Sequence, residues 1–327
     1  MRRTVFVILL GAGVLVAVAA LGTGTPPATA PLGLPQVPIP ADNPQTPEKI
    51  ALGEQLFHDV RFSKTGDVSC ATCHDAEKAF TDSPLKTSEG IEKLTGTRNA
   101  PTVVNAAYFA TQFWDGRSPS LEDQALHPFL NPVEMALESH QPILDIVRTD
   151  PEYVEAFQQV FGKTGDAITM DAVTKASAAC ERTQIAGDSP FDLWYYGGDA
   201  SALTEQQQRG FELFINQGRC VSCHVIEQTQ ALFTDNRFHN IGVGINDVQS
   251  DVPDLASEFI RADLELAEVD VKVLGDARTS ELGRFAVTTG FDDLGSFKTS
   301  TLRNIAVTAP YMHDGSLETL RDVVVHY

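Results

Sequence analysis

The chain has 327 residues, and 44 Asp and Glu residues against 24 Lys and Arg give it a formal net charge of −20 and a pI near 4.7. Proteins that bind nucleic acid need a basic surface, so this composition excludes nucleic acid as the partner. An acidic surface suits a small basic or dipolar redox protein, and it also keeps an exported protein in solution.

The first 30 residues predict export. Met1-Arg2-Arg3 precedes an uncharged apolar run from Val5 to Leu21, and the small-residue sequence Ala28-Thr29-Ala30 follows. This is the order of a secretory signal peptide. The apolar run is near the lower length limit of a membrane span, so an uncleaved membrane anchor is the alternative for residues 1–30. Residues 31–45 are rich in proline and poor in charge, which predicts an extended linker.

Two helix starts follow the same pattern. Thr46-Pro47-Glu48 places an N-cap residue, a first-turn proline and an acid in the order that helix starts prefer, and Thr204-Glu205 begins a similar stretch. Gly53-Glu54-Gln55-Leu56-Phe57 and Gly210-Phe211-Glu212-Leu213-Phe214 look like one element used twice. We interpret each as part of the opening helix of a domain.

Each of these helices leads to a Cys-x-x-Cys-His sequence, Cys70-Ala71-Thr72-Cys73-His74 and Cys220-Val221-Ser222-Cys223-His224. This pentapeptide is the attachment site of a c-type haem. The two thiols bond the haem covalently, and His74 and His224 are predicted to bind the two irons. A zinc site does not need a histidine directly after the second cysteine, and a dithiol redox site leaves the duplication unexplained. We therefore predict two covalently bound haems and a periplasmic location, where such haems are attached.

The rest of the chain is predicted to be helical. Apolar residues follow a helical period over 121–137, 143–161 and 168–185, and no run of alternating strands appears. Cys180, the odd thiol, is predicted to be a buried residue without a function. The acidic segment 242–283 predicts a solvent-facing surface insertion with a short helix near 255–266, and a docking surface is the alternative.

These features together predict the fold class. We expect a mainly α protein of two cytochrome c-like domains, residues 46–200 and 201–327, each with one covalently bound c-type haem.

Further landmarks resemble the bacterial di-haem cytochrome c peroxidases and their MauG-like relatives. They occur in the family's order and, with the haem motifs, extend over most of the chain after the linker. The landmarks are Thr97-Arg98-Asn99-Ala100-Pro101-Thr102, Gln112-Phe113-Trp114-Asp115-Gly116-Arg117, Asn131-Pro132-Val133-Glu134-Met135, Ser189-Pro190-Phe191-Asp192-Leu193, Gly283-Arg284-Phe285-Ala286-Val287 and Leu302-Arg303-Asn304-Ile305-Ala306-Val307-Thr308-Ala309-Pro310-Tyr311-Met312-His313-Asp314-Gly315.

The resemblance implies that peroxide chemistry takes place at the first haem. In this family a Gln and a Glu ten residues apart lie on its open face, and they match Gln124 and Glu134. Glu134 is expected to take a proton from peroxide and return it to the departing oxygen, while Gln124 orients the peroxide. Trp114 matches the family's electron relay between the haems. Three positions match its interdomain calcium site, whose ligands are oxygen atoms: Asn99, Thr308 and Pro310.

One departure from the typical peroxidases concerns the first haem. In those proteins a loop histidine caps this haem, but residues 81–98 contain no histidine here and Glu89 stands in the corresponding place. The first haem is therefore expected to be open without reductive activation. The alternative is that His127 or His140 substitutes as the cap.

A second departure concerns the other haem. Typical members have a methionine ligand fourteen residues after the position of His313, and here that position is Tyr327. A tyrosine ligand favours ferric iron and is the MauG-like arrangement. Met312 and His326 are the alternative ligands.

The resemblance predicts an enzyme that reduces hydrogen peroxide at the N-terminal haem with electrons passed through the C-terminal haem. The electron donor is expected to be a small redox protein, either a cytochrome c or a cupredoxin. One alternative is a MauG-like oxidase that modifies a protein substrate, and another is a di-haem electron-transfer cytochrome without catalysis. The resemblance also implies a homodimer.

Overall fold

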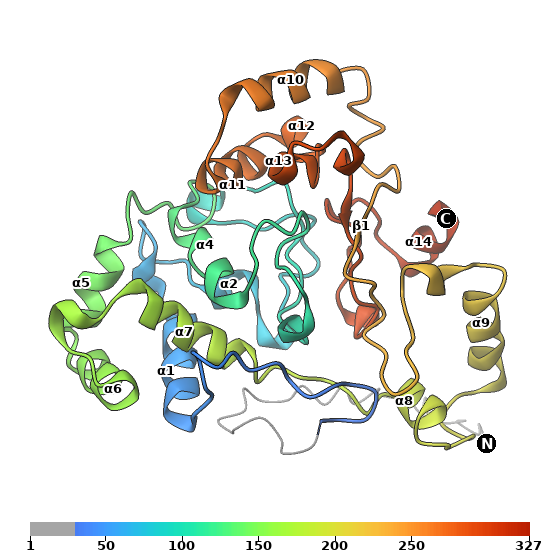
Figure 1. Ribbon diagram of the computed structural model, residues 1–327, viewed down its shortest axis with the longest axis horizontal. Helices are drawn as coiled ribbons and strands as arrows, with labels where there is room; N and C mark the ends of the chain where they lie inside the picture. Colours follow the sequence, from blue (N-terminus) through green and yellow to red (C-terminus); the bar gives the residue numbers. More distant parts are fainter. Residues whose placement is uncertain (1–29) are drawn as a thin grey trace, which may run out of the picture.

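Helices dominate the computed structural model, which describes residues 30–327 (Figure 1). Apart from Ala30, the predicted signal peptide or anchor lies outside these residues. Within the described part of the chain, no helix combines the length and the apolar character needed to cross a membrane. The α-helices are α1 (Pro47–His58), α2 (Cys70–Cys73), α3 (Leu121–Gln124), α4 (His127–Leu130), α5 (Gln141–Thr149), α6 (Pro151–Phe161), α7 (Met170–Glu181), α8 (Pro190–Tyr195), α9 (Glu205–Ile215), α10 (Val252–Ala262), α11 (Leu266–Gly275), α12 (Ala277–Ser280), α13 (Phe285–Thr288) and α14 (Leu320–His326). The strands are β1 (Phe238–His239) and β2 (Phe297–Lys298), and short 3-10 helices cover Val60–Phe62, Ala76–Lys78, Ile91–Lys93, Ala106–Tyr108, Gly165–Ala167, Cys220–Ser222, Phe291–Asp293 and Ile305–Val307.

Helices α1 and α9 begin where the sequence predicts. Thr46 Oγ1 accepts a hydrogen bond from the backbone N of Lys49 at 3.2 Å, and Thr204 caps α9 in the same way. Helix α1 packs on α7, and a Cβ at Gly53 would lie 2.0 Å from the carbonyl oxygen of Ala176. The glycine therefore lets the two helices approach closely.

Prolines divide two of the predicted helices. The pattern over 143–161 forms both α5 and α6, because Pro151 holds Asp150 in an extended conformation with φ −68° and ψ 120°. The pattern over 121–137 forms only α3 and α4. Helix α4 ends before Asn131, which is extended because Pro132 follows it. Apolar periodicity shows which residues face the core, but it does not distinguish one helix from two.

The core of the N-terminal half lies between α1, α5, α6 and α7. Its largest fully buried side chains include Phe62, Ile143, Tyr153 and Phe157. Cys180 is 3% exposed on α7, so its predicted burial is confirmed.

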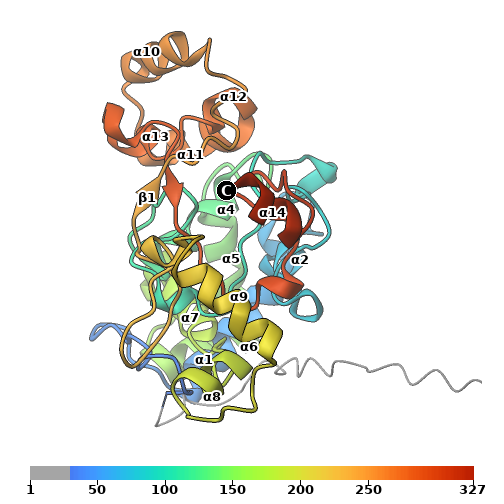
Figure 2. The same cartoon turned by 90° about the vertical axis from the view of Figure 1, so that its right-hand side faces the viewer.

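The segment 242–283 contains the predicted short helix, as α10, and many of its residues are exposed. It is more than a surface loop, because α10, α11 and α12 share a core with α13 that includes Phe259, Val273 and Phe285. Both views of the ribbon show these helices as a lobe at one end of the molecule (Figures 1 and 2). Most acidic residues of the segment are exposed, whereas Asp270 and Glu281 are buried, and the apolar faces of the amphipathic helices meet inside the lobe.

Buried contacts join the two halves of the chain. Arg303 Nη1 and Nη2 donate to the two carboxylate oxygens of Asp192, both at 2.9 Å, and neither side chain is more than 4% exposed. Within the C-terminal half, strand β1 pairs antiparallel with β2, which places Phe238 opposite Lys298. Lys298 Nζ also donates to the carbonyl oxygen of Thr111 at 2.6 Å. The two halves are therefore held together by buried polar groups, while the domain boundary at 200/201 stays a prediction.

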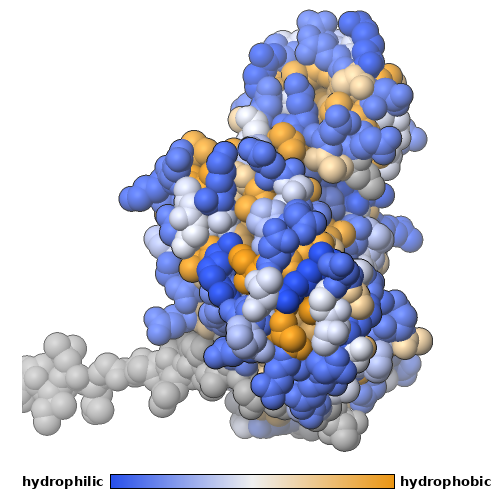
Figure 3. Space-filling view, turned by 90° about the vertical axis from the view of Figure 1, so that its left-hand side faces the viewer, coloured by the Kyte–Doolittle hydropathy of each residue, from blue (hydrophilic) through white to orange (hydrophobic). Residues whose placement is uncertain are grey.

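The surface agrees with the acidic composition. The side that carries α5 and α6 is mostly hydrophilic, with hydrophobic residues scattered between the hydrophilic ones (Figure 3). In the same view the lobe has hydrophilic residues around its rim and hydrophobic residues between them. This distribution is consistent with the net charge of −20.

Candidate haem and peroxide site

The first haem motif forms α2 and the residue after it. Cys70 and Cys73 lie at the two ends of α2, and both are free thiols. The Nδ1 atom of His74 lies 3.2 Å from the carbonyl oxygen of Phe80. When Nδ1 donates its proton to this carbonyl, the lone pair of Nε2 is available to an iron.

The second motif repeats this arrangement on the 3-10 turn Cys220–Ser222. His224 Nδ1 lies 2.9 Å from the carbonyl oxygen of Phe233, so Nε2 is again the available atom. Burial lowers the pKa of both His74 and His224, which favours the neutral imidazole that binds metals.

The surroundings of the motifs fit a haem. Phe57, Phe80 and Val103 form an apolar cluster beside the first motif. Arg98 is buried, and its Nη2 donates to the carbonyl oxygen of Ser280, yet its Nε and Nη1 have no partner in the described part of the chain. Burial lowers the pKa of Arg98 to about 10. Buried cationic donors without partners accommodate an anionic group, and this guanidinium lies where the two halves meet, 4.5 Å from the centroid of the Phe297 ring.

Glu134 lies on a tight turn beside the first motif. The loop that contains Gly90 packs closely on this turn. A Cβ at Gly90 would lie 2.1 Å from the carbonyl oxygen of Val133. Burial and then the negative charge of Asp270 raise the pKa of Glu134 to about 8. Burial and then the charge of Glu134 raise the pKa of Cys73 to about 12. The geometry agrees, because the backbone N of Ile91 donates to the carbonyl oxygen of Glu134 at 2.9 Å and the carbonyl oxygen of Glu89 lies 4.0 Å from Cys73 Sγ. The partly buried Glu134 side chain therefore lies on a turn beside the first haem motif.

Gln124 is the last residue of α3, and its side chain is partly buried. The helix is fixed by Ser120, whose Oγ accepts a hydrogen bond from the backbone N of Asp123 at 3.1 Å. Gln124 and Glu134 thus flank α4 along the chain. Their joint action on peroxide stays a prediction.

Trp114 contacts the junction between the two halves. Its Nε1 donates to the carbonyl oxygen of Asn99 at 2.9 Å, and the backbone N of Asn99 donates to the carbonyl oxygen of His313 at 2.8 Å. The ring of His313 stacks on Phe297 with 3.6 Å between the ring centroids. Trp114 also contacts the C-terminal half directly, because its carbonyl oxygen accepts a hydrogen bond from the backbone N of Lys298 at 2.7 Å. Its electron-relay role stays a prediction.

The histidines considered as caps of the first haem are engaged elsewhere. His140 Nε2 lies 3.2 Å from the carbonyl oxygen of Leu126. His127 lies between Asp123 and Asp270, with Nε2 3.5 Å and Nδ1 3.7 Å from their carboxylate oxygens. Glu89 is exposed. These contacts are consistent with an open first haem.

The candidates for the sixth ligand of the second haem differ in their contacts. Tyr327 is 70% exposed. Partial desolvation by the surrounding chain, followed by the charges of Cys223 and Cys220, raises its pKa. His326 Nε2 is already bonded to the carbonyl oxygen of Ile241 at 3.0 Å. This pattern favours Tyr327 over His326, and the assignment stays a prediction.

The residues of the predicted calcium site come from both halves. Asn99 Nδ2 donates to the carbonyl oxygen of Lys86 at 3.2 Å. Thr308 and Pro310 follow the 3-10 helix Ile305–Val307 in the C-terminal half. The bond between Asn99 and His313 places Asn99 beside this half. A calcium ion here stays a prediction.

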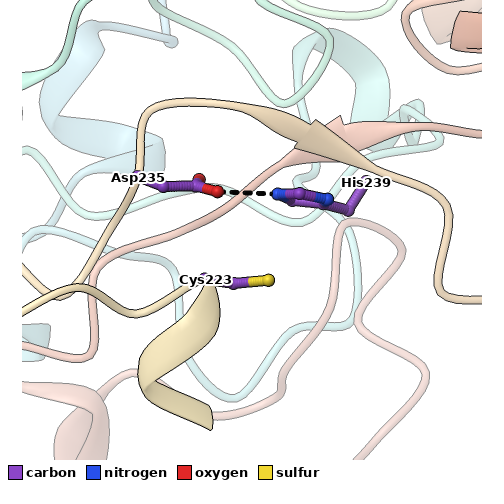
Figure 4. Close-up of side chains that lie close together, drawn as sticks. All are labelled: Cys223, Asp235 and His239. Atoms are coloured by element: carbon purple, nitrogen blue, oxygen red, sulfur yellow. Dashed lines mark hydrogen bonds and ion pairs between the residues drawn. The ribbon is translucent and has the colours of Figure 1, made fainter. Parts of the chain in front are cut away.

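A cluster of potential metal ligands lies at the second motif. Ligand atoms of Cys223, Asp235 and His239 all lie within 4.8 Å of one another, the only such group of three found in residues 30–327. His239 Nε2 is 2.8 Å from Asp235 Oδ2, and the Sγ atom of Cys223 lies near this pair (Figure 4). Because Cys223 belongs to a haem attachment motif, the cluster marks the edge of the second haem site.

An internal duplication extends well beyond the repeated opening helices and haem motifs that were predicted. Phe80 and Phe233 both have positive φ, 57° and 52°, and both accept the hydrogen bond of a motif histidine. Thr102 and Thr301 each donate from Oγ1 to the carbonyl oxygen of the residue before the phenylalanine, at 2.6 and 2.7 Å. The repeated sequence Phe-Thr-Asp at 80–82 and 233–235 was the signal that could have revealed this.

The duplication continues beyond these residues. Asp115-Gly116 lies in the turn closed by the bridge Gln112–Ser118, and Asp314-Gly315 lies at the same place in the turn closed by Tyr311–Leu317; both glycines have positive φ. Trp114 in the first copy thus corresponds to His313 in the second. The two residues that meet at Asn99 are equivalent members of the two halves.

The fold and the two sites define a largely helical protein with two c-type haem attachment sites. Residues 47–201 match the profile of the family described as di-haem cytochrome c peroxidase. The chain is 36% identical over 305 residues to cytochrome-c peroxidase IdrP1 of Denitromonas iodatirespirans, covering 91% of this chain and 77% of that protein. It is also 36% identical over 291 residues to methylamine utilization protein MauG of Methylorubrum extorquens, covering 89% and 71%. The crystal structure of a MauG-like protein associated with microbial copper homeostasis matches with a TM-score of 0.70 and 31% identity, covering 90% of this chain and 79% of that chain.

The chain therefore belongs to the di-haem cytochrome c peroxidase family, and the predicted family is confirmed. It is an oxidoreductase, and its family implies two c-type haems. Both peroxidases and MauG proteins are among its relatives.

Proposed function

We propose that this chain is a periplasmic peroxidase that reduces hydrogen peroxide beside His74, with electrons that enter beside His224. The observation that supports this most is the position of Glu134. It is a carboxyl group with a pKa raised to about 8, close enough to the first haem motif to raise the pKa of Cys73. A carboxyl group of this kind can accept and return protons near neutral pH.

The chemistry requires two electrons and two protons for each peroxide, which becomes two water molecules as the O–O bond breaks. Haem iron, when bound, supplies the electron-transfer chemistry. Ionised Glu134 takes the proton from one peroxide oxygen and returns it to the other, which departs as water. Gln124 orients the peroxide by donating a hydrogen bond from its side-chain amide.

The surroundings of the first motif support an accessible site. Residues 81–98 contain no histidine, and His127 and His140 are engaged with other groups. Peroxide can therefore approach without the displacement of a protein ligand.

Electrons pass between the two sites through Trp114, whose indole is bonded to the junction of the halves. A small redox protein, either a cytochrome c or a cupredoxin, is the electron donor, and the acidic surface suits a basic partner. The protein acts as a homodimer with a calcium ion at Asn99, Thr308 and Pro310. Calcium content and molar mass of the purified holoprotein test these two parts of the proposal.

A steady-state assay with hydrogen peroxide and reduced cytochrome c tests the proposed function. We expect continuous oxidation of the cytochrome. The Tyr327 position and the identity with MauG favour one second candidate, a MauG-like oxidase of a protein substrate. Near-zero turnover together with a stable oxidised species after peroxide addition supports that candidate.

Electron paramagnetic resonance separates both candidates from a non-catalytic electron-transfer cytochrome. An open first haem gives a high-spin ferric signal, because it lacks a second strong-field protein ligand. Two low-spin haems and no high-spin signal contradict the proposed function.

Replacing Tyr327 by methionine is expected to raise the reduction potential of the second haem by an amount on the order of 100 mV, because a thioether ligand favours ferrous iron. Spectroelectrochemical titration of the holoprotein measures this shift. His326→Met is the matched control, since His326 is bonded to a backbone carbonyl. A shift in the control but not in Tyr327→Met would assign the ligand to His326.

A further inference from the structure

The lobe formed by segment 242–283 contributes a buried carboxylate, that of Asp270, which contacts the turn that carries Glu134. Asp270 lies on α11 and is 3% exposed. Its Oδ1 accepts hydrogen bonds from Arg117 Nε at 2.9 Å and Nη2 at 2.6 Å, and its Oδ2 accepts one from Asn131 Nδ2 at 2.7 Å. All the partners of this carboxylate belong to the N-terminal half, although Asp270 belongs to the C-terminal half.

Asn131 connects this carboxylate to the catalytic turn. Its Oδ1 accepts from the backbone N of Val133 at 3.1 Å. Its carbonyl oxygen accepts from the backbone N of Glu134 at 3.1 Å and of Ala136 at 2.9 Å. Asn131 is 1% exposed, and the hydrogen bond that its Nδ2 donates to Asp270 orients the amide so that Oδ1 faces the backbone N of Val133.

Arg117 is held equally tightly. It is bonded to Asp115 at 2.9 Å and to Asp270, and its guanidinium lies 3.6 Å from the centroid of the Phe113 ring. Neither Asp115 nor Asp270 is more than 4% exposed, so the network is shielded from water. The shared hydrogen bonds couple the positions of Asp115, Arg117 and Asp270.

The lobe is also docked firmly where α11 meets the N-terminal half. Val133 packs against the apolar core of the lobe. Thr97 Oγ1 donates to the carbonyl oxygen of Val273 at 2.7 Å and pairs with Ser280 Oγ at 2.8 Å. The position of Asp270 relative to the turn is therefore set by contacts on both sides of it.

We propose that Asp270 is a positioning residue for Glu134: through Asn131 it fixes the turn 131–136, and through its charge with that of Arg117 it sets the electrostatic field at the Glu134 carboxyl group. This inference rests on the proposed function, since it takes Glu134 as the group that moves the proton. It assigns a role in the reaction at the first haem to a lobe in the C-terminal half of the chain.

The charged groups around Glu134 determine the expected pH effect. Asp270 raises its pKa and Arg117 lowers it, while Cys73 faces it from α2 and is uncharged once bonded to haem. Asp115 and His127 are the further titratable groups, and both contact the Arg117–Asp270 pair. Loss of the Asp270 charge therefore lowers the pKa of Glu134, and its ionised form appears at lower pH.

The experiment measures the second-order rate constant for the reaction of ferric holoprotein with hydrogen peroxide, by stopped-flow absorbance, as a function of pH. In Asp270→Asn, the new side-chain NH2 group faces the NH2 group of Asn131, so the hydrogen bond that orients Asn131 is lost. We therefore expect about a tenfold lower rate constant at the plateau. We expect the midpoint of the pH profile to fall by about one unit. Amide hydrogen exchange in residues 131–136 should become faster in the same variant.

Two further variants separate position from charge. Asn131→Ser keeps the Arg117–Asp270 pair, so we expect a similar loss of rate without a shift of the midpoint. Asp263→Asn makes the same charge change at an exposed position of the same segment and should match the wild type.

The outcomes distinguish this inference from the proposed function. An unchanged rate, midpoint and exchange in Asp270→Asn overturns the positioning role, as does an equal effect in Asp263→Asn. If Asp270→Asn does not bind haem, Asn131→Ser decides: wild-type rate and exchange in that variant overturn the inference. An unchanged rate in Glu134→Gln instead refutes the proposed function, whatever Asp270→Asn shows.

Discussion

Replacing Glu134 by glutamine is expected to lower the second-order rate constant for the reaction with hydrogen peroxide by about 10²–10⁴-fold, which is the usual contribution of a general acid–base group. Glutamine keeps the size and a hydrogen-bonding end, but it cannot accept and return a proton. Stopped-flow absorbance of the ferric holoprotein measures this rate constant. Unchanged haem content and an unchanged ferric spectrum would show that the site itself is intact.

The pH dependence of the wild type gives a second signature of the same group. The pKa of Glu134 is raised to about 8, so the carboxyl is protonated below this pH and ionised above it. Because the ionised form takes the first proton, the rate constant should rise as pH increases through about 8. This rise should be absent in Glu134→Gln.

Glu138 offers the matched control. It is exposed and lies four residues further along the chain, so Glu138→Gln makes the same chemical change outside the site. We expect its rate constant and pH profile to match the wild type. Equal losses in both variants would remove the case for Glu134 as the proton-transferring group.

Replacing Arg303 by methionine is expected to lower the free energy of unfolding by about 3–5 kcal/mol, because it leaves the Asp192 carboxylate buried without its cation. Asp192 has no exposed side-chain surface, and Arg303 joins it from the other half of the chain. Asp192 keeps its hydrogen bonds from the backbone N and Oγ of Ser189, so the start of α8 is not disturbed. Urea unfolding of the holoprotein, followed by circular dichroism, measures the change.

Arg278→Met is the control for this prediction. Arg278 is 58% exposed and pairs with Asp251 at 2.7 Å on the surface. Loss of an exposed pair costs about 0–1 kcal/mol. Similar destabilisation in the two variants would mean that the Arg303–Asp192 pair does not hold the two halves together.

Local signals in the sequence were sufficient for several features. The two Cys-x-x-Cys-His motifs and the capped starts at Thr46 and Thr204 depend on residues close together in the chain, and the structure has the motif turns and the helices where these signals predict them. The family could also be predicted, because its landmarks keep their order along the chain. Helix ends were predicted less well, since Pro151 divides an otherwise continuous apolar pattern.

The site beyond the haem motifs depended on the resemblance. Nothing local distinguishes Glu134 from an ordinary surface acid, and its raised pKa comes from burial and from Asp270, 136 residues further on in the sequence. Asp270 itself had no signal, because it lies in a segment whose acidic composition predicts exposure to solvent.

The sequence by itself determined the cofactor attachment sites, the helical class and the family of this protein, because each of these is written in short runs of neighbouring residues. Only the tertiary structure decided which acids are surface charges and which are buried working groups. Burial and charge pairing are properties of atoms brought together from distant parts of the chain. The pairing of Arg117 with Asp270 and of Arg303 with Asp192 therefore appears only when the two halves are packed against each other.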